Sequence, residues 1–67
     1  MLPTKQKQLL DFIKQYITQK NIAPSLKEMG KGLGVKSIST IHQHLSSLEE
    51  KGYIHRYKNR TRSVEIK

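Results

Sequence analysis

Cysteine is absent from this chain, which excludes a disulfide framework and any thiolate metal site. Apolar residues never occur more than two in a row, so no segment is long enough to span a membrane. The first twenty residues are rich in lysine and glutamine and contain no apolar signal region. From these absences we expect a soluble intracellular protein that holds no metal and no cofactor.

Acidic residues are also scarce: five Asp and Glu stand against thirteen Lys and Arg, which gives a net charge of +8. A chain of 67 residues has room for one hydrophobic core, so residues 1–67 are expected to form a single domain. The net positive charge of this domain should attract polyanions. All three arginines lie within the last twelve residues, where their planar guanidinium groups suit contacts with phosphate or guanine. The competing interpretation, a membrane-binding helix, is disfavoured because this region has few large apolar residues.

Apolar residues at helical spacing predict three helices. The first covers residues 5–20 and has Thr4 as its N-cap. It should end at Asn21, because asparagine is suited to the left-handed conformation that often ends a helix. Its inner stripe consists of Leu9, Phe12, Ile13, Tyr16 and Ile17.

The second predicted helix, over residues 26–33, has the clearest start. Ser25 and Glu28 form a capping box, and Gly34 should end the helix. Gly30 is expected on the apolar face, where its missing side chain lets the backbone of another helix approach. Gly32 is expected to point outward, and no feature of the sequence accounts for it.

The third predicted helix covers residues 38–51 and follows Ser37 as its N-cap. Its inner face carries Ile38, Ile41, Leu45 and Leu48. The outward side of its N-terminal half carries Ser39, Thr40, His42 and Gln43. A merely solvated face would be expected to carry lysine and glutamate, as the first helix carries lysine. Uncharged hydrogen-bonding side chains instead suit the reading of base edges in a major groove.

After Gly52 the apolar period changes from that of a helix to that of a strand. Residues 53–57 and 63–66 are predicted to form a β-hairpin, with Ile54, Val64 and Ile66 turned inward. The basic tip between the strands consists of Lys58, Asn59, Arg60, Thr61 and Arg62. A hairpin that follows two helices joined by a short turn predicts an α+β, mostly α fold: a winged helix-turn-helix with three helices and a C-terminal two-stranded β-hairpin wing.

Several short segments, in order and at matching spacing, also carry a family resemblance. They are the apolar stripe of residues 9–17, Ala23-Pro24-Ser25, Lys27-Glu28-Met29 with Leu33-Gly34, Lys36-Ser37, His44-Leu45 with Leu48, and Lys51-Gly52-Tyr53-Ile54. In these segments the chain, from Leu2 to about Ile66, resembles the N-terminal DNA-binding domain of the LexA repressor family.

The resemblance implies a bacterial transcriptional repressor of the SOS regulon, whose third helix enters the major groove while its wing contacts the DNA backbone. The base-contacting positions of the family fall on Ser37, Ser39, Thr40, His42 and Gln43. Ser37 matches the family and the other four differ. Since His42 and Gln43 stand where the best-known members have acidic residues, a different operator sequence is expected. Backbone contacts are expected from Lys36, Lys58, Asn59, Arg60, Thr61 and Arg62.

The partner that the resemblance implies is double-stranded DNA with a palindromic operator, bound in the cytoplasm at the bacterial nucleoid. No membrane and no small-molecule substrate are expected. Because the internal faces take up the apolar residues, the isolated chain should be a monomer that pairs on DNA. The self-cleaving second half of the family is absent from residues 1–67, so we expect no enzyme. The sequence is then either an excised domain or a stand-alone regulator of a phage or mobile element.

Two other classes of function compete with sequence-specific DNA binding. Catalysis is disfavoured because the five carboxylates are scattered, and because His42 and His44 are two residues apart on a helix and cannot face each other. A winged fold can also be a scaffold for protein interaction or nonspecific nucleic-acid binding, since fold alone does not establish function. RNA is disfavoured because only Tyr53 and Tyr57 offer outward aromatic rings for stacking on unpaired bases.

Overall fold

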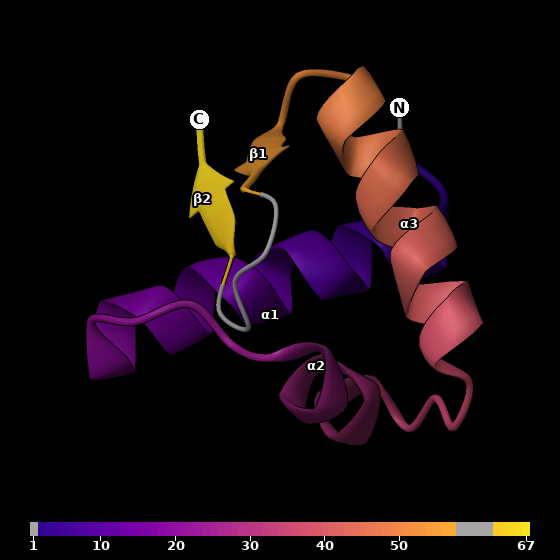
Figure 1. The fold of residues 1–67 in the computed structure, drawn as a ribbon, viewed down its shortest axis with the longest axis horizontal. Helices are drawn as coiled ribbons and strands as arrows, with labels where there is room; N and C mark the ends of the chain where they lie inside the picture. The colour runs from indigo at the N-terminus through magenta and orange to yellow at the C-terminus, as the bar shows by residue number, and fades with distance from the viewer. Residues whose placement is uncertain (1, 58–62) are drawn as a thin grey trace.

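Three helices and a two-stranded antiparallel sheet make up the fold (Figure 1). A computed structural model describes residues 2–57 and 63–67. The elements are α1 (Thr4–Lys20), α2 (Leu26–Leu33), α3 (Ile38–Glu50), β1 (Ile54–Arg56) and β2 (Val64–Ile66). The helices pack against one another in all three pairs, and β1 packs against α3. This arrangement confirms the predicted winged helix-turn-helix.

Helix α1 begins one residue earlier than the sequence indicated. Thr4 lies inside the helix, and the N-cap is Pro3, which has no side-chain hydrogen bond to offer. The predicted capping role of Thr4 is therefore wrong. The other end is as predicted, because Asn21 adopts a left-handed conformation with φ 60° and its N–H donates to the Ile17 carbonyl.

Local hydrogen bonds fix both ends of α2 and the start of α3. The Ser25 hydroxyl accepts from the Glu28 N–H at 3.2 Å, and the Glu28 carboxylate accepts from the Ser25 N–H at 2.8 Å, which confirms the capping box. Gly34 ends α2 with φ 69°, a conformation that side chains rarely adopt. The Ser37 hydroxyl then accepts from the Thr40 N–H at 3.4 Å and caps α3.

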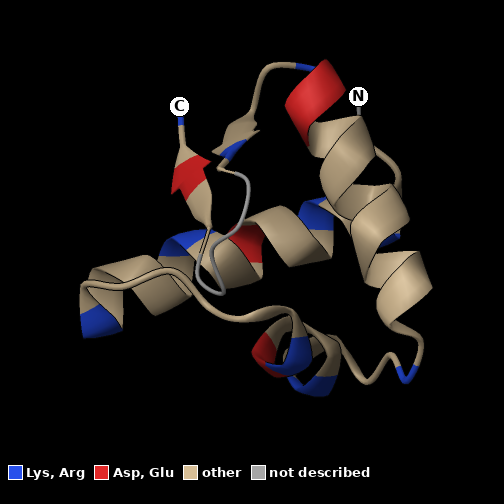
Figure 2. Ribbon diagram, viewed as in Figure 1, with Lys and Arg blue, Asp and Glu red and all other residues tan. Residues whose placement is uncertain are grey.

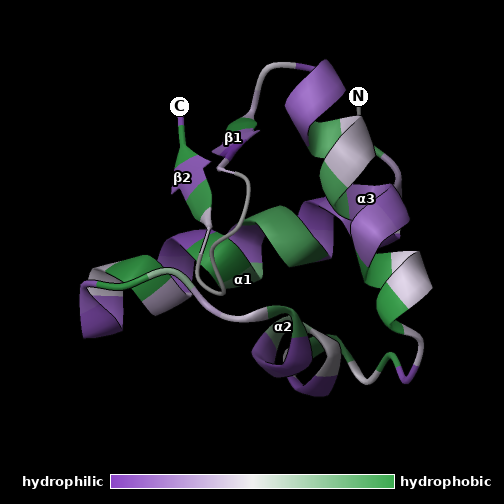
Figure 3. Cartoon of the chain, in the orientation of Figure 1, coloured by the Kyte–Doolittle hydropathy of each residue, from purple (hydrophilic) through white to green (hydrophobic). Residues whose placement is uncertain are grey.

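The core draws side chains from all five elements, and Figure 3 shows apolar residues in each of them. Its buried members are Leu9, Leu10, Ile13, Met29, Ile41, Leu45, Leu48, Ile54 and Val64. Ile38 was expected in the inner face of α3, but it is 43% exposed, so that expectation is wrong. At 100° per residue Ile38 lies about 60° from Ile41 around the helix, and it occupies the first turn, at the edge of the core.

The two glycines inside α2 each allow a close approach that the sequence did not identify. A Cβ on Gly30 would lie 2.9 Å from the Val35 carbonyl oxygen, so the backbone that approaches belongs to the following turn and not to another helix. A Cβ on Gly32 would lie 2.6 Å from Cζ of Phe12 and would also overlap Cε1. Gly32 is exposed, as expected, but a side chain at this position would point at the Phe12 ring of α1 and not freely outward, which gives the glycine the structural reason that the sequence did not reveal.

The hairpin pairs Ile54 with Ile66, His55 with Glu65 and Arg56 with Val64. Its strands are shorter than predicted, but Ile54 and Val64 are buried as expected, and Ile66 packs against the core. Alternate residues of a strand point to opposite faces, so this register places the pair of Ile54 and Ile66 on the side that faces the helices. The tip, Lys58 to Arg62, lies outside the described residues.

The contact between Gly32 and Phe12 predicts that Gly32→Ala destabilises the protein. Alanine gains about 1 kcal/mol of helix propensity, whereas overpacking costs about 1–3 kcal/mol, so we expect a net loss of up to about 2 kcal/mol. In a Phe12→Leu background the ring is gone, and Gly32→Ala should become neutral or stabilising. Urea unfolding of the four proteins in this cycle measures the coupling. The same loss in both backgrounds would show that the ring does not limit position 32.

Candidate nucleic-acid interface

The outward side of α3 is polar, exposed and uncharged over most of its length. Ser39 is exposed, and so are His42, Gln43 and Ser46, which lie three, four and seven residues after it and therefore on the same side of the helix. Figure 2 shows that α3 has no charged residue before its C-terminal end, where Glu49 and Glu50 lie. Side chains of this kind can donate and accept hydrogen bonds at base edges.

The turn that precedes α3 adds a positive charge and a capping hydroxyl to this side. Lys36 and Ser37 are both exposed. The Ser37 oxygen accepts the bond from the Thr40 N–H, so its hydroxyl hydrogen can still be donated to a phosphate or a base. The positive end of the helix dipole lies at the same place and favours an anion there.

The predicted base-contacting residues lie together, with one difference in exposure. Ser37, Ser39, His42 and Gln43 are exposed, whereas Thr40 is half-buried. Ser46 lies on the same face one turn beyond Gln43 and was not among the predicted contacts. Its spacing from Ser39 and Gln43 is the signal that could have identified it. Of the predicted backbone contacts, Lys36 lies beside this group, and Lys58 to Arg62 fall outside the described residues.

Positive charge also extends along α2. Lys27 and Lys31 are exposed there, and they precede Lys36 along the chain (Figure 2). The one acidic residue of α2, Glu28, is engaged with the backbone of Ser25. The exposed side chains of the helix-turn-helix unit are therefore basic or neutral up to the end of α3, as an electrostatic contact with phosphates requires.

The C-terminal end of α3 is joined to β1 through the Glu49 carboxylate. One oxygen accepts from the Arg56 backbone N–H at 3.0 Å, and the other accepts from Arg56 Nε at 3.0 Å. Arg56 Nη2 also donates to the Ser46 hydroxyl at 3.0 Å, and His55 Nδ1 lies 3.6 Å from Glu49. The Arg56 N–H bond, followed by its guanidinium group, holds the pKa of Glu49 below the usual value of 4.5 despite desolvation by burial.

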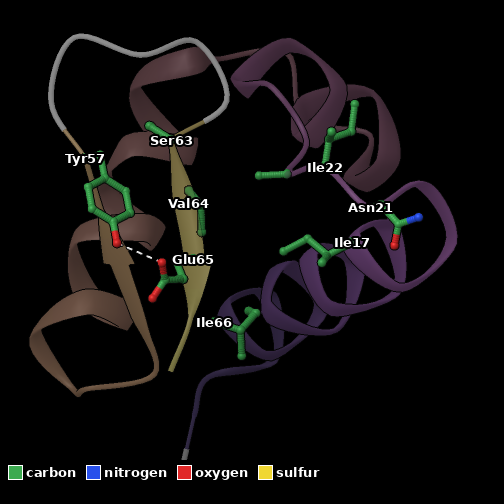
Figure 4. A pocket seen from close by; sticks show the side chains of 9 residues that line it. Ile17, Asn21, Ile22, Tyr57, Ser63, Val64, Glu65 and Ile66 are labelled. Carbon is green, nitrogen blue, oxygen red and sulfur yellow. Dashed lines mark hydrogen bonds between the residues drawn. The ribbon is translucent and has the colours of Figure 1, made fainter.

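A shallow groove of about 460 Å³ lies on another side of the molecule, between the C-terminal end of α1 and the hairpin (Figure 4). Ile17, Ile22 and Val64 contribute apolar surface, and the Tyr57 hydroxyl donates to Glu65 at 2.7 Å. Among the described residues of the lining, Glu65 is acidic and none is a lysine or an arginine, so these residues do not provide the positive charge that a phosphate site needs.

Two further classes of site find no support in residues 2–57 and 63–67. In this part of the chain no group of three or more His, Cys, Asp and Glu residues is placed to hold a metal ion. Among the same residues, no helix combines the length and the apolar character needed to cross a membrane. The outward side of α3, with the turn before it, is thus the surface whose chemistry points most directly to a ligand.

Comparison with known proteins gives one family. The model of the LexA DNA-binding domain matches residues 1–63. Among curated proteins, the LexA repressors of Bacillus mycoides (strain KBAB4) and Bacillus cereus (strain Q1) are each 48% identical to the chain over 65 residues. The alignment covers 97% of this chain and 32% of each relative. The chain thus spans about a third of the length of these relatives.

The lowered pKa of Glu49 predicts how stability depends on pH. A carboxyl whose pKa is lower in the folded state stabilises the fold above its unfolded-state pKa, and this contribution disappears as the pH falls through the folded-state value. We expect Glu49→Gln to lower Tm near neutral pH, and the difference from the wild type to close as the pH drops below 4.5.

Thermal unfolding followed by circular dichroism between roughly pH 7 and pH 3 measures this difference. Glu50→Gln is the matched control, because it removes the same charge from the adjacent, exposed residue of α3. A difference between Glu49→Gln and the wild type that stays constant with pH would contradict the expectation.

Proposed function

Because the chain belongs to the LexA DNA-binding domain family, we propose that it binds double-stranded DNA at specific sequences, as the DNA-reading part of a bacterial transcriptional repressor. The observation that carries this proposal is the exposed, uncharged, hydrogen-bonding side of α3. A helix of this kind fits the width of the major groove of B-DNA, where each base pair presents a distinct pattern of donors and acceptors.

The contacts divide into those that read bases and those that hold the backbone. Base readout falls to Ser37, Ser39, Thr40, His42 and Gln43, of which Gln43 has the chemistry to pair with adenine and the hydroxyls can pair with any base. Lys36, at the N-terminal end of α3, and the wing residues Lys58, Asn59, Arg60, Thr61 and Arg62 bind phosphates. These last contacts fix the register of the helix and supply affinity that is independent of sequence.

The repressor role also sets the form of the complex. Two copies of the domain occupy a two-fold symmetric operator, one on each half-site, in the bacterial nucleoid. Each copy alone is a monomer with weak affinity, and joining two copies raises the effective concentration of the second. The regulated genes belong to the SOS response, as the resemblance to this family implies. In this proposal the domain has no catalytic activity of its own.

Selection of bound sites from a random DNA pool tests the proposal directly. A preferred site that stays bound in excess random duplex supports sequence-specific binding. Enrichment of no site would instead favour a nonspecific nucleic-acid-binding module, and no binding to any duplex would favour a protein-interaction module. The selected site then serves as the operator for affinity measurements on variants.

Base reading by α3 predicts that Gln43→Ala and Ser39→Ala each weaken binding to the preferred site by about 1–3 kcal/mol. Random duplex should hardly be affected, because it is held through phosphates. Fluorescence anisotropy with both duplexes measures the two affinities. Gln19→Ala, which alters an exposed glutamine of α1, is the matched control and should change neither. Equal losses on both duplexes would mean that α3 does not read bases.

Phosphate binding by the wing predicts a different pattern for Arg60→Ala and Arg62→Ala. Each should weaken all DNA sequences similarly and should reduce the slope of log K against log salt by about 0.9 for each phosphate that is no longer neutralised. Lys14→Ala removes one positive charge from the exposed side of α1 and is the control. A salt slope that stays at the wild-type value in both wing variants would remove the wing from the interface.

A further inference from the structure

The wing is attached to the helical part of the molecule through a short junction. Helix α3 ends at Glu50 and β1 begins at Ile54, with Gly52 between them at φ 85°. The Tyr53 N–H donates to the Leu48 carbonyl at 3.0 Å, which holds the chain close to the end of the helix. The packing of β1 on α3 and the buried Ile54 then fix the first residue of the strand.

Ile54 is the apolar anchor of β1 itself, Val64 and Ile66 of the paired strand β2 also pack against the core, and a polar contact gives β1 a further anchor. It lies at Arg56, the last residue of β1, two residues beyond Ile54. Both oxygens of Glu49 receive donors from Arg56, one from its backbone N–H and one from Nε, each at 3.0 Å. Since the backbone N–H takes part, the bond fixes the strand itself and not only a side chain.

Arg56 also connects this anchor to the outward side of α3. Its Nη2 donates to the hydroxyl of Ser46, which lies on the same face as Gln43, one turn away. With 29% of its side chain exposed, Arg56 spans Glu49 and Ser46 along the helix. The planar guanidinium group holds its Nε and Nη2 donors in fixed directions, one toward Glu49 and one toward Ser46, which a lysine ammonium group would not do.

We propose that Glu49 and Arg56 are positioning residues that hold the wing at a fixed angle to α3, so that helix and wing engage the same DNA site together. This inference rests on the proposed DNA binding. Neither residue needs to contact DNA for this purpose. The pair makes the modest contribution to stability that is usual for partly exposed ion pairs, and in addition it fixes the orientation of the hairpin before DNA is bound.

The sign of one substitution separates positioning from simple electrostatics. Removing a carboxylate from a protein that binds phosphates should tighten DNA binding if charge alone matters. Glu50 is the neighbouring exposed carboxylate, and we therefore expect the Glu50→Gln variant to bind the selected operator as well as the wild type does, or more tightly. Glu49→Gln makes the same change in charge but disrupts the bond with Arg56, and we expect it to weaken operator binding at least about fivefold, the lower end of typical coupling between linked sites.

Anisotropy titrations of wild type, Glu49→Gln and Glu50→Gln on the selected operator, at several salt concentrations, make this comparison. Glu49→Gln should also show a smaller salt slope, because the phosphate contacts of the wing are formed less completely. Operator binding by Glu49→Gln that equals or exceeds that of Glu50→Gln would overturn the proposal. Failure of the wild type itself to select any site would overturn the proposed function instead.

A measurement without DNA tests the positioning role separately from the proposed DNA binding. Residual dipolar couplings of the free protein report the orientation of the hairpin relative to α3. In Glu49→Gln the couplings of residues 54–56 and 64–66 should no longer fit the orientation found in the wild type, whereas those of the three helices should. Unchanged hairpin couplings would overturn the proposal whatever the affinity for DNA.

Arg56→Lys provides a second variant should Glu49→Gln fold poorly. It preserves the positive charge and removes the planar guanidinium group that reaches both Glu49 and Ser46. We expect weaker operator binding and a wing reorientation similar to those of Glu49→Gln, with no further loss in the double variant. Additive losses, with a wild-type hairpin orientation in Arg56→Lys, would indicate a direct DNA contact and contradict a positioning role.

Discussion

Helix α3 imposes the constraint on which the rest of the structure depends, because its two sides must meet opposite requirements. The inner side supplies Ile41, Leu45 and Leu48, three of the nine buried apolar residues in the described part of the chain, and α3 packs against α1, α2 and β1. Burial of each such side chain contributes roughly 1.5–3 kcal/mol. With stability provided on one side, the residues of the other side are free to serve recognition.

The presentation of α3 depends on its entry turn. The capping box of Ser25 fixes the start of α2, Gly34 ends that helix in a left-handed conformation, and Ser37 starts the next. Close approach of Gly30 to the Val35 carbonyl makes this turn compact. A Cβ at position 30 would require the backbone at Val35 to shift, so a residue without a side chain constrains the turn that leads into α3.

Local signals were readable from the sequence, and tertiary ones were not. Ser25, Glu28, Gly34 and Asn21 act through their own backbone neighbours, so spacing alone predicted their roles. The packing of Gly32 against Phe12 joins residues of two helices and depends on how those helices cross, which spacing does not specify. The outward face of α3 is likewise a local feature and was predicted. The bond from Arg56 to Glu49 is a tertiary feature and was not, because it depends on the register of the hairpin and on its angle to α3.

Charge and its absence have separate roles in this domain. A net charge of +8 attracts any DNA and gives no preference among sequences. The preference must come from side chains that exchange hydrogen bonds with base edges, because contacts to phosphates are made with every sequence alike. The uncharged outward side of α3, set between the basic turn at Lys36 and the ion pair of Glu49 with Arg56, satisfies this condition. The acidic residue near that face is compatible with DNA binding because the guanidinium group that it orients also neutralises it.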